Sequence, residues 1–439
     1  MSASPGQRPL RIRGARAALC EAPVDEPTSI LVADGRIAAV GEDADAAGAC
    51  EELDADGLWA LPGWIDVQVN DIEWLAGGSR DPAEHAARIR QVVEYQSARG
   101  VTGCVLATLA APIDEIVAYL DGMRLVLDGR EPGDAAFLGG LVEGTFMNPR
   151  FHGAHNPDRV LPPDGEVFDR LLATGALRMI NIAPETSADA IDLVARAARA
   201  GVVVGCGHAN PHAERLREAV DAGMRYIIHL GNGPTGSHWK RFHDGGMLEE
   251  SLRNDDLIAT IIVDGWHVHP SLVRDWIARK EVSRTVGISD AGFALGPPDG
   301  PFEVFGIRGE PAEDGAYLKV VPQDGDPQPD PLSSEVSALF GSTVGMREVF
   351  ENLVNLLSTE VEGVYRRRHQ AMSLARSIEA AARMCSGNPA RLLGIGERGS
   401  LRRGARADLV LAEMRGAPGS LRVEPVSTFL GGRQVIGGT

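Results

Sequence analysis

The stretch VVVGCGH, residues 202–208, decides the fold class of this 439-residue chain. Three valines, a glycine and a cysteine form a run without a polar side chain, as in a β-strand that is buried on both faces. Such strands belong to parallel sheets that helices cover on both sides. The run nevertheless ends at His208, an ionisable residue. A buried strand that ends in an imidazole raises the question of how the other strands end.

Apolar runs of this kind recur along the chain, and the segments between them carry apolar residues at the three- and four-residue spacing of amphipathic helices. The eight runs cover residues 59–67, 100–108, 136–144, 176–184, 201–208, 224–231, 257–265 and 284–292. Eight strand–helix units in a row predict a (β/α)8 barrel rather than an open, doubly wound sheet. No GxGxxG motif follows the first run, which also disfavours a dinucleotide-binding fold.

Both ends of the chain have a different sequence pattern. Short runs in which apolar and polar residues alternate are interrupted by Gly and Asp, as in β-hairpins. We therefore predict an α/β fold with a TIM-like barrel over 59–394 and a small β-sandwich domain built from both chain ends, 1–58 and 395–439. Residues 293–343 are rich in Pro, Gly and Asp and form a long insertion after the eighth strand. A loop of this length in a compact domain is usually functional or disordered.

The composition restricts the partners. A formal net charge of −18 argues against nucleic acid and against an anionic membrane surface. The N-terminal segment lacks the apolar core of a signal peptide, and no later apolar run has the length of a membrane span. The five cysteines are scattered and show no CxxC spacing, which is typical of a reduced, cytoplasmic protein. We therefore expect a cytoplasmic protein with a small-molecule partner.

Ionisable residues close several of the apolar runs, and in a barrel the carboxyl ends of the strands line the active site. These residues are Glu143 in the third run, His208 in the fifth, His229 in the sixth, Asp264 followed by His267 in the seventh, and Asp290 in the eighth. A single histidine at such a place is more often structural, and an aspartate is often the N-cap of the next helix. The joint placement of all of them favours an active site.

Two imidazoles and one carboxylate are a ligand set of catalytic zinc, which leaves a fourth position for water. Asp290 would then accept the proton of that water. The sequence HVH at 267–269 also has the spacing of two ligands on one face of a strand. However, His269 precedes Pro270 at an apparent helix start, so we interpret His269 as structural and His267 as a substrate contact.

Seven motifs carry a family resemblance over nearly the whole chain. They are LPGWIDVQVN (61–70), GLVEGTFMNPRFHGAHNPD (140–158), GHAN (207–210), HLGNG (229–233), VDGWHVHP (263–270), SDAG (289–292) and SGNPARLLGIGERGSLRRGARADLVL (386–411). With these motifs the chain resembles the N-acetylglucosamine-6-phosphate deacetylases of the amidohydrolase superfamily. The combination of Glu-Gly, Asn-Pro and Gly-Ala-His is the specific part, whereas the last motif indicates only the superfamily.

The resemblance implies a role for each matching position. Glu143, His208 and His229 match the metal ligands. Asp290 matches the catalytic acid/base, and His155 matches the residue that helps to polarise the acetyl carbonyl. The positions implied for substrate binding are Asn232 and Gly233, together with His267 and Arg241 for the sugar phosphate, where Lys240 is a rival to Arg241. The resemblance also implies a homodimer.

The first run departs from the many amidohydrolases that carry His-x-His there for a second metal. This chain has Gln68, Val69 and Asn70 at these positions. The neutral amides of Gln68 and Asn70 are poor ligands for the second divalent metal ion. We therefore predict one divalent metal ion, Zn²⁺ with Fe²⁺ or another divalent ion as alternatives, and Gln68 lining the crater. The run 176–184 has no lysine for a carboxylated bridge, which disfavours the dihydroorotase and hydantoinase branches.

These features together predict a metal-dependent hydrolase that removes the N-acetyl group from an amino sugar, N-acetylglucosamine 6-phosphate in the first place, and releases acetate and the amine. Departures around the pocket, such as Thr145, Gly231 and the stretch DIEWLAGG at 71–78, leave the identity of the sugar open. One alternative is another amidohydrolase, a deaminase or an amidase for a different N-acyl compound. A non-catalytic barrel scaffold is disfavoured, because the three metal ligands Glu143, His208 and His229 and the acid/base Asp290 are all present.

Overall fold

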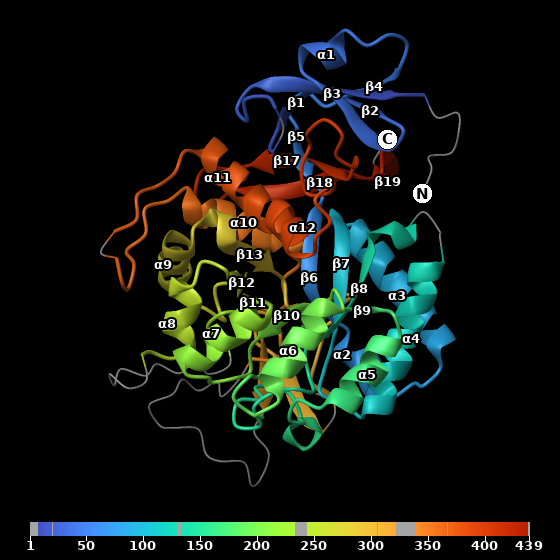
Figure 1. The fold of residues 1–439 in the computed structure, drawn as a ribbon. Helices are drawn as coiled ribbons and strands as arrows, with labels where there is room; N and C mark the ends of the chain where they lie inside the picture. The colour runs from blue at the N-terminus through green and yellow to red at the C-terminus, as the bar shows by residue number, and fades with distance from the viewer. Residues whose placement is uncertain are drawn as a thin grey trace.

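A computed structural model describes residues 8–19, 21–129, 133–232, 244–304, 306–321, 339–366 and 368–437. These residues form a helix-covered barrel and, beside one end of it, a second sheet to which both ends of the chain contribute (Figure 1). None of the helices in these ranges has the length and apolar character needed to cross a membrane.

The predicted barrel is confirmed. Eight strands follow one another in a single sheet in sequence order, and each pairs in parallel with the next. They are β6 (Trp64–Asn70), β7 (Val101–Thr108), β8 (Phe137–Val142), β9 (Leu177–Asn181), β10 (Val203–Cys206), β11 (Met224–Ile227), β12 (Ile258–Ile262) and β13 (Thr285–Ile288). Seven of them lie within an apolar run, and β6 begins in the first run and extends to Asn70.

The last strand returns to the first at a seam that polar groups hold together. Val69 and Ala291 form a parallel bridge, just beyond the end of β13. The backbone N–H of Asp290 donates to the carbonyl oxygen of Gln68 at 3.1 Å. One residue before Asp290, the Ser289 hydroxyl donates to the buried carboxylate of Asp66 at 2.5 Å. The seam therefore brings Gln68 and Asp290, far apart in sequence, side by side.

Helices alternate with the strands and surround the barrel (Figure 1). They include α3 (Pro82–Ser97), α4 (Ile113–Asp128), α5 (Gly165–Ala173), α6 (Ala190–Arg199), α7 (Ala213–Ala222), α8 (Met247–Arg253), α9 (Pro270–Lys280), α10 (Met346–Leu357), α11 (Leu374–Ala382) and α12 (Asn388–Leu392). Helix α3 is typical, because the Asp81 side chain caps it by accepting from the Ala83 N–H at 2.8 Å. Ile89 and Val93, four residues apart, lie on its buried face.

The second sheet confirms the prediction of a β domain built from both chain ends. Its strands are β1 (Leu10–Ala17), β2 (Pro27–Ala33), β3 (Arg36–Val40), β4 (Glu51–Asp54), β5 (Trp59–Pro62), β17 (Leu409–Arg415), β18 (Arg422–Leu430) and β19 (Arg433–Gly437). N-terminal β5 pairs with C-terminal β17, so that the two ends form one sheet.

The prediction of one barrel strand over residues 59–67 is wrong. The run contains two strands separated by Gly63, and β5 belongs to the terminal sheet while only β6 enters the barrel. A Cβ atom at Gly63 would lie 2.2 Å from the side chain of Thr102, so the chain passes closely over β7 at this break. Every residue of both strands is buried, so hydrophobicity alone does not separate them. The division into 1–58, 59–394 and 395–439 stays a prediction.

The insertion after β13 has a small antiparallel sheet of its own. It consists of β14 (Phe302–Val304), β15 (Ile307–Pro311) and β16 (Leu318–Val321). Its aromatic residues Phe302 and Phe340 stack edge to face and pack with Ile72 and Leu109 of the barrel loops. Because β6 leaves the terminal sheet at its amino end, these loops lie at the opposite, carboxyl end of the barrel. The insertion therefore covers the face where active sites of such barrels lie.

Candidate active site

Three of the predicted ligands converge at the carboxyl ends of their strands. Glu143 follows β8, His208 follows β10 and His229 follows β11, and all three side chains are buried. One potential ligand atom from each lies within 4.8 Å of the other two. The Nε2 atoms of His229 and His208 are 2.9 Å and 3.4 Å from the same carboxylate oxygen, Glu143 Oε1. Residues 65 and 86 positions away from Glu143 along the chain thus form one cluster.

The cluster fits a divalent cation. Tetrahedral coordination with bonds of about 2.0–2.2 Å places neighbouring ligand atoms roughly 3.3–3.6 Å apart, near the separations found here. The Nδ1 of His208 lies 2.9 Å from the carbonyl oxygen of Phe151 and donates to it, so the lone pair of Nε2 faces the cluster. The ring of His229 makes its contact through Nε2, because its buried Nδ1 has no hydrogen-bond partner among the described residues.

Glycines allow the loops to close around this cluster. A Cβ atom on Gly144, next to Glu143, would lie 2.1 Å from the backbone nitrogen of Ala110. Gly153 has φ +61°, and a Cβ there would lie 2.8 Å from Cε1 of His208. The Glu-Gly and His-Gly-Ala-His elements of the sequence therefore have a steric reason, since larger residues would push the loops away from the ligands.

The backbone is strained where three site residues leave their strands. His208, His229 and Asp290 have φ values of 49°, 30° and 47°, in the left-handed region that costs non-glycine residues about 1–3 kcal/mol each. Hydrogen bonds compensate, such as the 2.7 Å bond that the His229 N–H donates to the Thr260 hydroxyl. The turn at each strand end directs a polar side chain into the same crater.

Two amide side chains from β6 connect the ligand cluster to Asp290. The Nε2 of Gln68 donates to Glu143 Oε2 and to Asp290 Oδ1, both at 2.9 Å. The Nδ2 of Asn70 donates to the same Oδ1 atom of Asp290, also at 2.9 Å. Burial and the negative charge of Glu143 raise the pKa of Asp290 to about 8. A cation held by Glu143 would oppose this shift, so Asp290 is placed to take up and return a proton near neutral pH.

Glu143 itself is held in its charged form. Burial raises its pKa, but the surrounding imidazoles of His155, His208 and His229 outweigh burial and bring the pKa of Glu143 well below its usual value. His155 is also buried, and this lowers its pKa. Its Nδ1 accepts from the Ala110 N–H at 3.2 Å, so the neutral ring carries its hydrogen on Nε2. That N–H lies 3.8 Å from Glu143 Oε1 and is available to a substrate carbonyl.

A cavity of about 340 Å³ opens over these groups, within the size range of small-molecule sites. Its polar side consists of Asn70, Glu143, His155, His208, His229, Asn232, His267 and Asp290. Ile72, Leu109 and Ala154 from the barrel loops and Leu339 and Phe340 from the insertion provide apolar wall. In the sequence Asn70 stands out only as part of the departure from His-x-His, and no role in the site was predicted for it. Its position two residues after Gln68, on the same face of β6, was the available signal.

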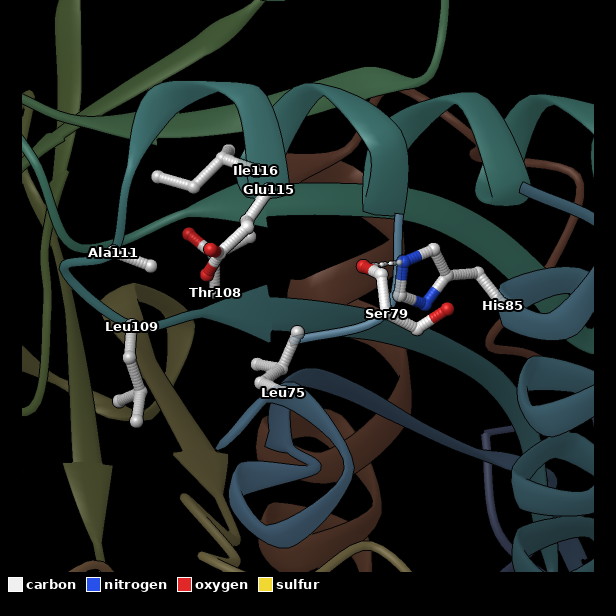
Figure 2. Close-up of a pocket in the computed structure, with 8 residues that line it drawn as sticks. All are labelled: Leu75, Ser79, His85, Thr108, Leu109, Ala111, Glu115 and Ile116. Carbon is white, nitrogen blue, oxygen red and sulfur yellow. Dashed lines mark hydrogen bonds between the residues drawn. The ribbon is translucent and has the colours of Figure 1, made fainter. Parts of the chain in front are cut away.

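A second hollow lies between α2 (Ile72–Ala76), α3 and α4 (Figure 2). It shares Leu109 with the cavity over the cluster, but its space of about 10 Å³ holds at most a single water molecule. Figure 2 shows His85 at one end, where its Nε2 donates to the carbonyl oxygen of Ser79 at 3.0 Å. Its Nδ1 accepts from the Trp74 indole at 2.9 Å, so both ring nitrogens are used within the fold.

The remaining predicted residues divide into two groups. His267 lines the cavity, and its Nδ1 lies 2.6 Å from the carboxylate of Asp264. Asn232 lines it as well. His269 caps α9 and accepts from the Ser271 N–H at 3.2 Å, as its structural interpretation requires. Gly233 and Arg241, together with the rival Lys240, lie outside the described residues. The substrate contacts therefore stay predictions.

The chain is similar to known proteins over almost its whole length. No family model matches it. An N-acetylgalactosamine-6-phosphate deacetylase of Escherichia coli O157:H7 is 29% identical over 387 residues, which are 87% of this chain and 89% of that protein. An N-acetylglucosamine-6-phosphate deacetylase of Lysinibacillus sphaericus is 25% identical over 89% and 90% of the two chains.

Solved structures share the fold. The N-acetyl-D-glucosamine-6-phosphate deacetylase of Mycobacterium smegmatis superimposes with a TM-score of 0.77 at 24% identity and covers 98% of this chain. The enzyme of Pasteurella multocida gives 0.77 at 19% identity over 97% of it. The barrel and the terminal sheet lie within a chain that these superpositions cover to 98% and 97%. Over most of its length the chain is thus similar to N-acetylglucosamine-6-phosphate and N-acetylgalactosamine-6-phosphate deacetylases.

Proposed function

We propose that the protein is a metal-dependent hydrolase that removes the N-acetyl group from an amino-sugar 6-phosphate and releases acetate and the free amine. The observation that carries the proposal is the cluster of Glu143, His208 and His229, with ligand atoms within 4.8 Å, connected through Gln68 to Asp290. Two proteins that are 29% and 25% identical to most of this chain are named as deacetylases of such sugars.

A divalent cation at the cluster would supply Lewis acidity to the hydrolytic water and to the acyl oxygen. The residues around it divide the remaining work. Asp290 takes a proton from the attacking water and returns it to the departing nitrogen, a role that its raised pKa suits. The Nε2–H of His155 donates to the acyl oxygen as negative charge develops there. Burial of both groups keeps water from competing for these bonds.

The metal is proposed to be zinc. Two imidazole nitrogens and one carboxylate oxygen are ligands that zinc accepts, and Fe²⁺ or another divalent ion is the alternative. Elemental analysis of the purified protein is expected to give one metal ion per chain. Glu143→Gln should lose most of that metal, because the replacement removes the negative charge that both imidazoles face. Full metal content in this variant would contradict the assigned ligand set.

The sugar is proposed to be N-acetylglucosamine 6-phosphate or its galactosamine epimer. Relatives of both kinds are similar to this chain, and the two compounds differ only in the orientation of the C4 hydroxyl. His267 and Arg241 are the proposed phosphate contacts, and Gly233 with Asn232 the proposed contacts to the sugar. Rates of acetate release from both phosphates and from the unphosphorylated sugars test this proposal. Release of ammonia without acetate would instead indicate a deaminase.

The oligomeric state and the cellular location of the enzyme are proposed as well. We propose a homodimer, as implied by the family, and a cytoplasmic location. The described cysteines Cys50, Cys104, Cys206 and Cys385 are free thiols, as expected in a reducing compartment. Light scattering of the purified protein measures its mass in solution and tests the dimer directly.

A further inference from the structure

One buried oxygen atom on the polar side of the cavity has no partner. Asn70 is 3% exposed and lines the cavity, and its Oδ1 accepts no hydrogen bond from any described residue. A buried amide oxygen without a donor is unfavourable by about 1–3 kcal/mol, and such atoms are rare in folded proteins. At the wall of a substrate cavity, the missing donor is most simply a group of the substrate.

The orientation of the Asn70 amide follows from its neighbour. Its nitrogen faces Asp290 Oδ1 at 2.9 Å, and the Gln68 amide nitrogen donates to the same oxygen. Turning the Asn70 amide over would bring two oxygens together and lose a hydrogen bond to a carboxylate. The nitrogen is therefore fixed on Asp290, and the oxygen of Asn70 is left without a donor among the described residues.

The position of this oxygen identifies the group that it meets. Asn70 lines the cavity and donates to the carboxylate that delivers the proton to the departing nitrogen, so that nitrogen must come close to this residue. A secondary amide carries one N–H there, a donor that no other assigned residue uses. His155, the proposed donor to the acyl group, offers an N–H and not an acceptor for this hydrogen.

We propose that Asn70 accepts a hydrogen bond from the N–H of the scissile amide and keeps it through the reaction. The inference rests on the deacetylase function proposed above. The oxygen of water bonds to the acetyl carbon, and the carbon–nitrogen bond breaks with its electron pair remaining on nitrogen. Before this bond breaks, the nitrogen lone pair takes the proton that Asp290 removed from water, so the products are the amine and acetic acid, which ionises to acetate. The original N–H stays on nitrogen, and its bond to Asn70 strengthens as the nitrogen gains positive character.

An ester substrate separates this role from simple support of Asp290. The amide is N-acetylglucosamine 6-phosphate, and the matched ester is 2-O-acetylglucose 6-phosphate, whose bridging oxygen carries no hydrogen. Asn70→Ala removes both the donor to Asp290 and the acceptor in the cavity. Loss of the donor affects both substrates, but loss of the acceptor affects the amide alone. We expect kcat/KM to fall about 10- to 100-fold further for the amide than for the ester.

Gln68→Ala is the matched control. Gln68 donates to the same Asp290 oxygen from the same strand, but it is not among the residues that line the cavity. This variant should lower kcat/KM by a similar factor for both substrates. An equal loss for both substrates in Asn70→Ala, or no loss in either, would overturn the proposal. A wild-type protein that hydrolyses neither compound would instead refute the deacetylase function.

Binding to an inactive variant gives a second readout. In Asp290→Asn the dissociation constants of the amide and the ester are measured with and without Asn70→Ala. The added substitution should weaken binding of the amide several-fold and leave binding of the ester unchanged. This arm decides the question even if the wild-type protein turns over the amide alone. Equal weakening of both ligands would count against the N–H contact.

Discussion

The backbone N–H of Ser342 donates a 2.8 Å hydrogen bond to the carbonyl oxygen of Asp290. Ser342 lies where the insertion returns to the barrel, and its hydroxyl also donates to the carbonyl oxygen of Ser289 at 2.5 Å. The insertion is thus fastened to the strained residue that we assign as acid/base. It also contributes Phe340 and Leu339 to the cavity wall. The insertion, which resembles a loop in the sequence, therefore contacts the backbone of Asp290 and forms part of the cavity wall.

Substitution of Gly341 by alanine tests this attachment. Gly341 has φ +66°, and a Cβ atom would lie 2.9 Å from the Cα of Gly292 and 3.0 Å from the Asp290 carbonyl oxygen. The clash should displace the Asp290 backbone, so we expect kcat to fall about tenfold or more while the metal content stays unchanged. Gly300→Ala is the control, because nothing lies within 4 Å of its Cβ. Equal kcat values in both variants and the wild-type protein would contradict this coupling.

Replacing Asp290 by asparagine should separate chemistry from metal binding. Asparagine cannot take up and return the proton, so acetate release should fall about 10²- to 10⁴-fold. Asp290 is outside the Glu143, His208 and His229 cluster, so the metal content should match that of the wild-type protein. Acetate release and elemental analysis on the same preparation provide the measurement. Substantial turnover in Asp290→Asn would refute the acid/base role.

His267 should act on binding and not on chemistry. Its Nδ1 is fixed on Asp264, whose pKa is lowered because hydrogen bonds from His267 outweigh the opposing effect of burial. The Nε2 is therefore left for the cavity. In His267→Asn we expect KM for the sugar 6-phosphate to rise about tenfold or more, with kcat little changed. The unphosphorylated sugar serves as the internal control. If KM rose equally for both substrates, His267 would not contact the phosphate.

Much of the fold could be predicted because its signals are local. The eight barrel strands are buried on both faces, and their apolar runs are separated by helical periodicity. The assignment of β5 failed because it depends on partners at the other end of the chain. Trp59–Pro62 is as buried as β6, but its neighbours are β17 and β1. A short apolar run does not indicate which distant segment of the chain its strand pairs with.

The site could be predicted as a set of residues but not as a network. The polar residues that end the apolar runs include Glu143, His208, His229 and Asp290, which the structure brings to one cavity. The hydrogen bonds of Asn70 to Asp290, by contrast, depend on closure of β6 against β13. The attachment of the insertion through Ser342 depends on the path of a long connection, which residue type and spacing do not determine.

The buried carboxyl of Asp66 should make the stability of the protein depend on pH. Burial raises its pKa from 3.8 to about 6, against the opposing hydrogen bond from Ser289. The folded state therefore holds this proton more tightly than the unfolded chain does. Its contribution to stability is full below about pH 4 and is lost as the pH rises to about 6, by about 3 kcal/mol in total.

Asp66→Asn isolates this contribution. Its side-chain oxygen can still accept from the backbone N–H groups of Gln68 and Ser289, and the Ser289 hydroxyl can turn to the carbonyl oxygen of Gln68 at 3.3 Å. The variant does not titrate, so its stability relative to the wild-type protein should rise by about 1 kcal/mol between pH 5 and pH 7.5. Urea unfolding of both metal-loaded proteins at the two pH values measures the difference. If the difference did not change with pH, Asp66 would already be ionised in the folded protein at pH 5. The wild-type protein loses stability between pH 5 and pH 7.5 only if the Asp66 carboxyl still holds its proton at pH 5.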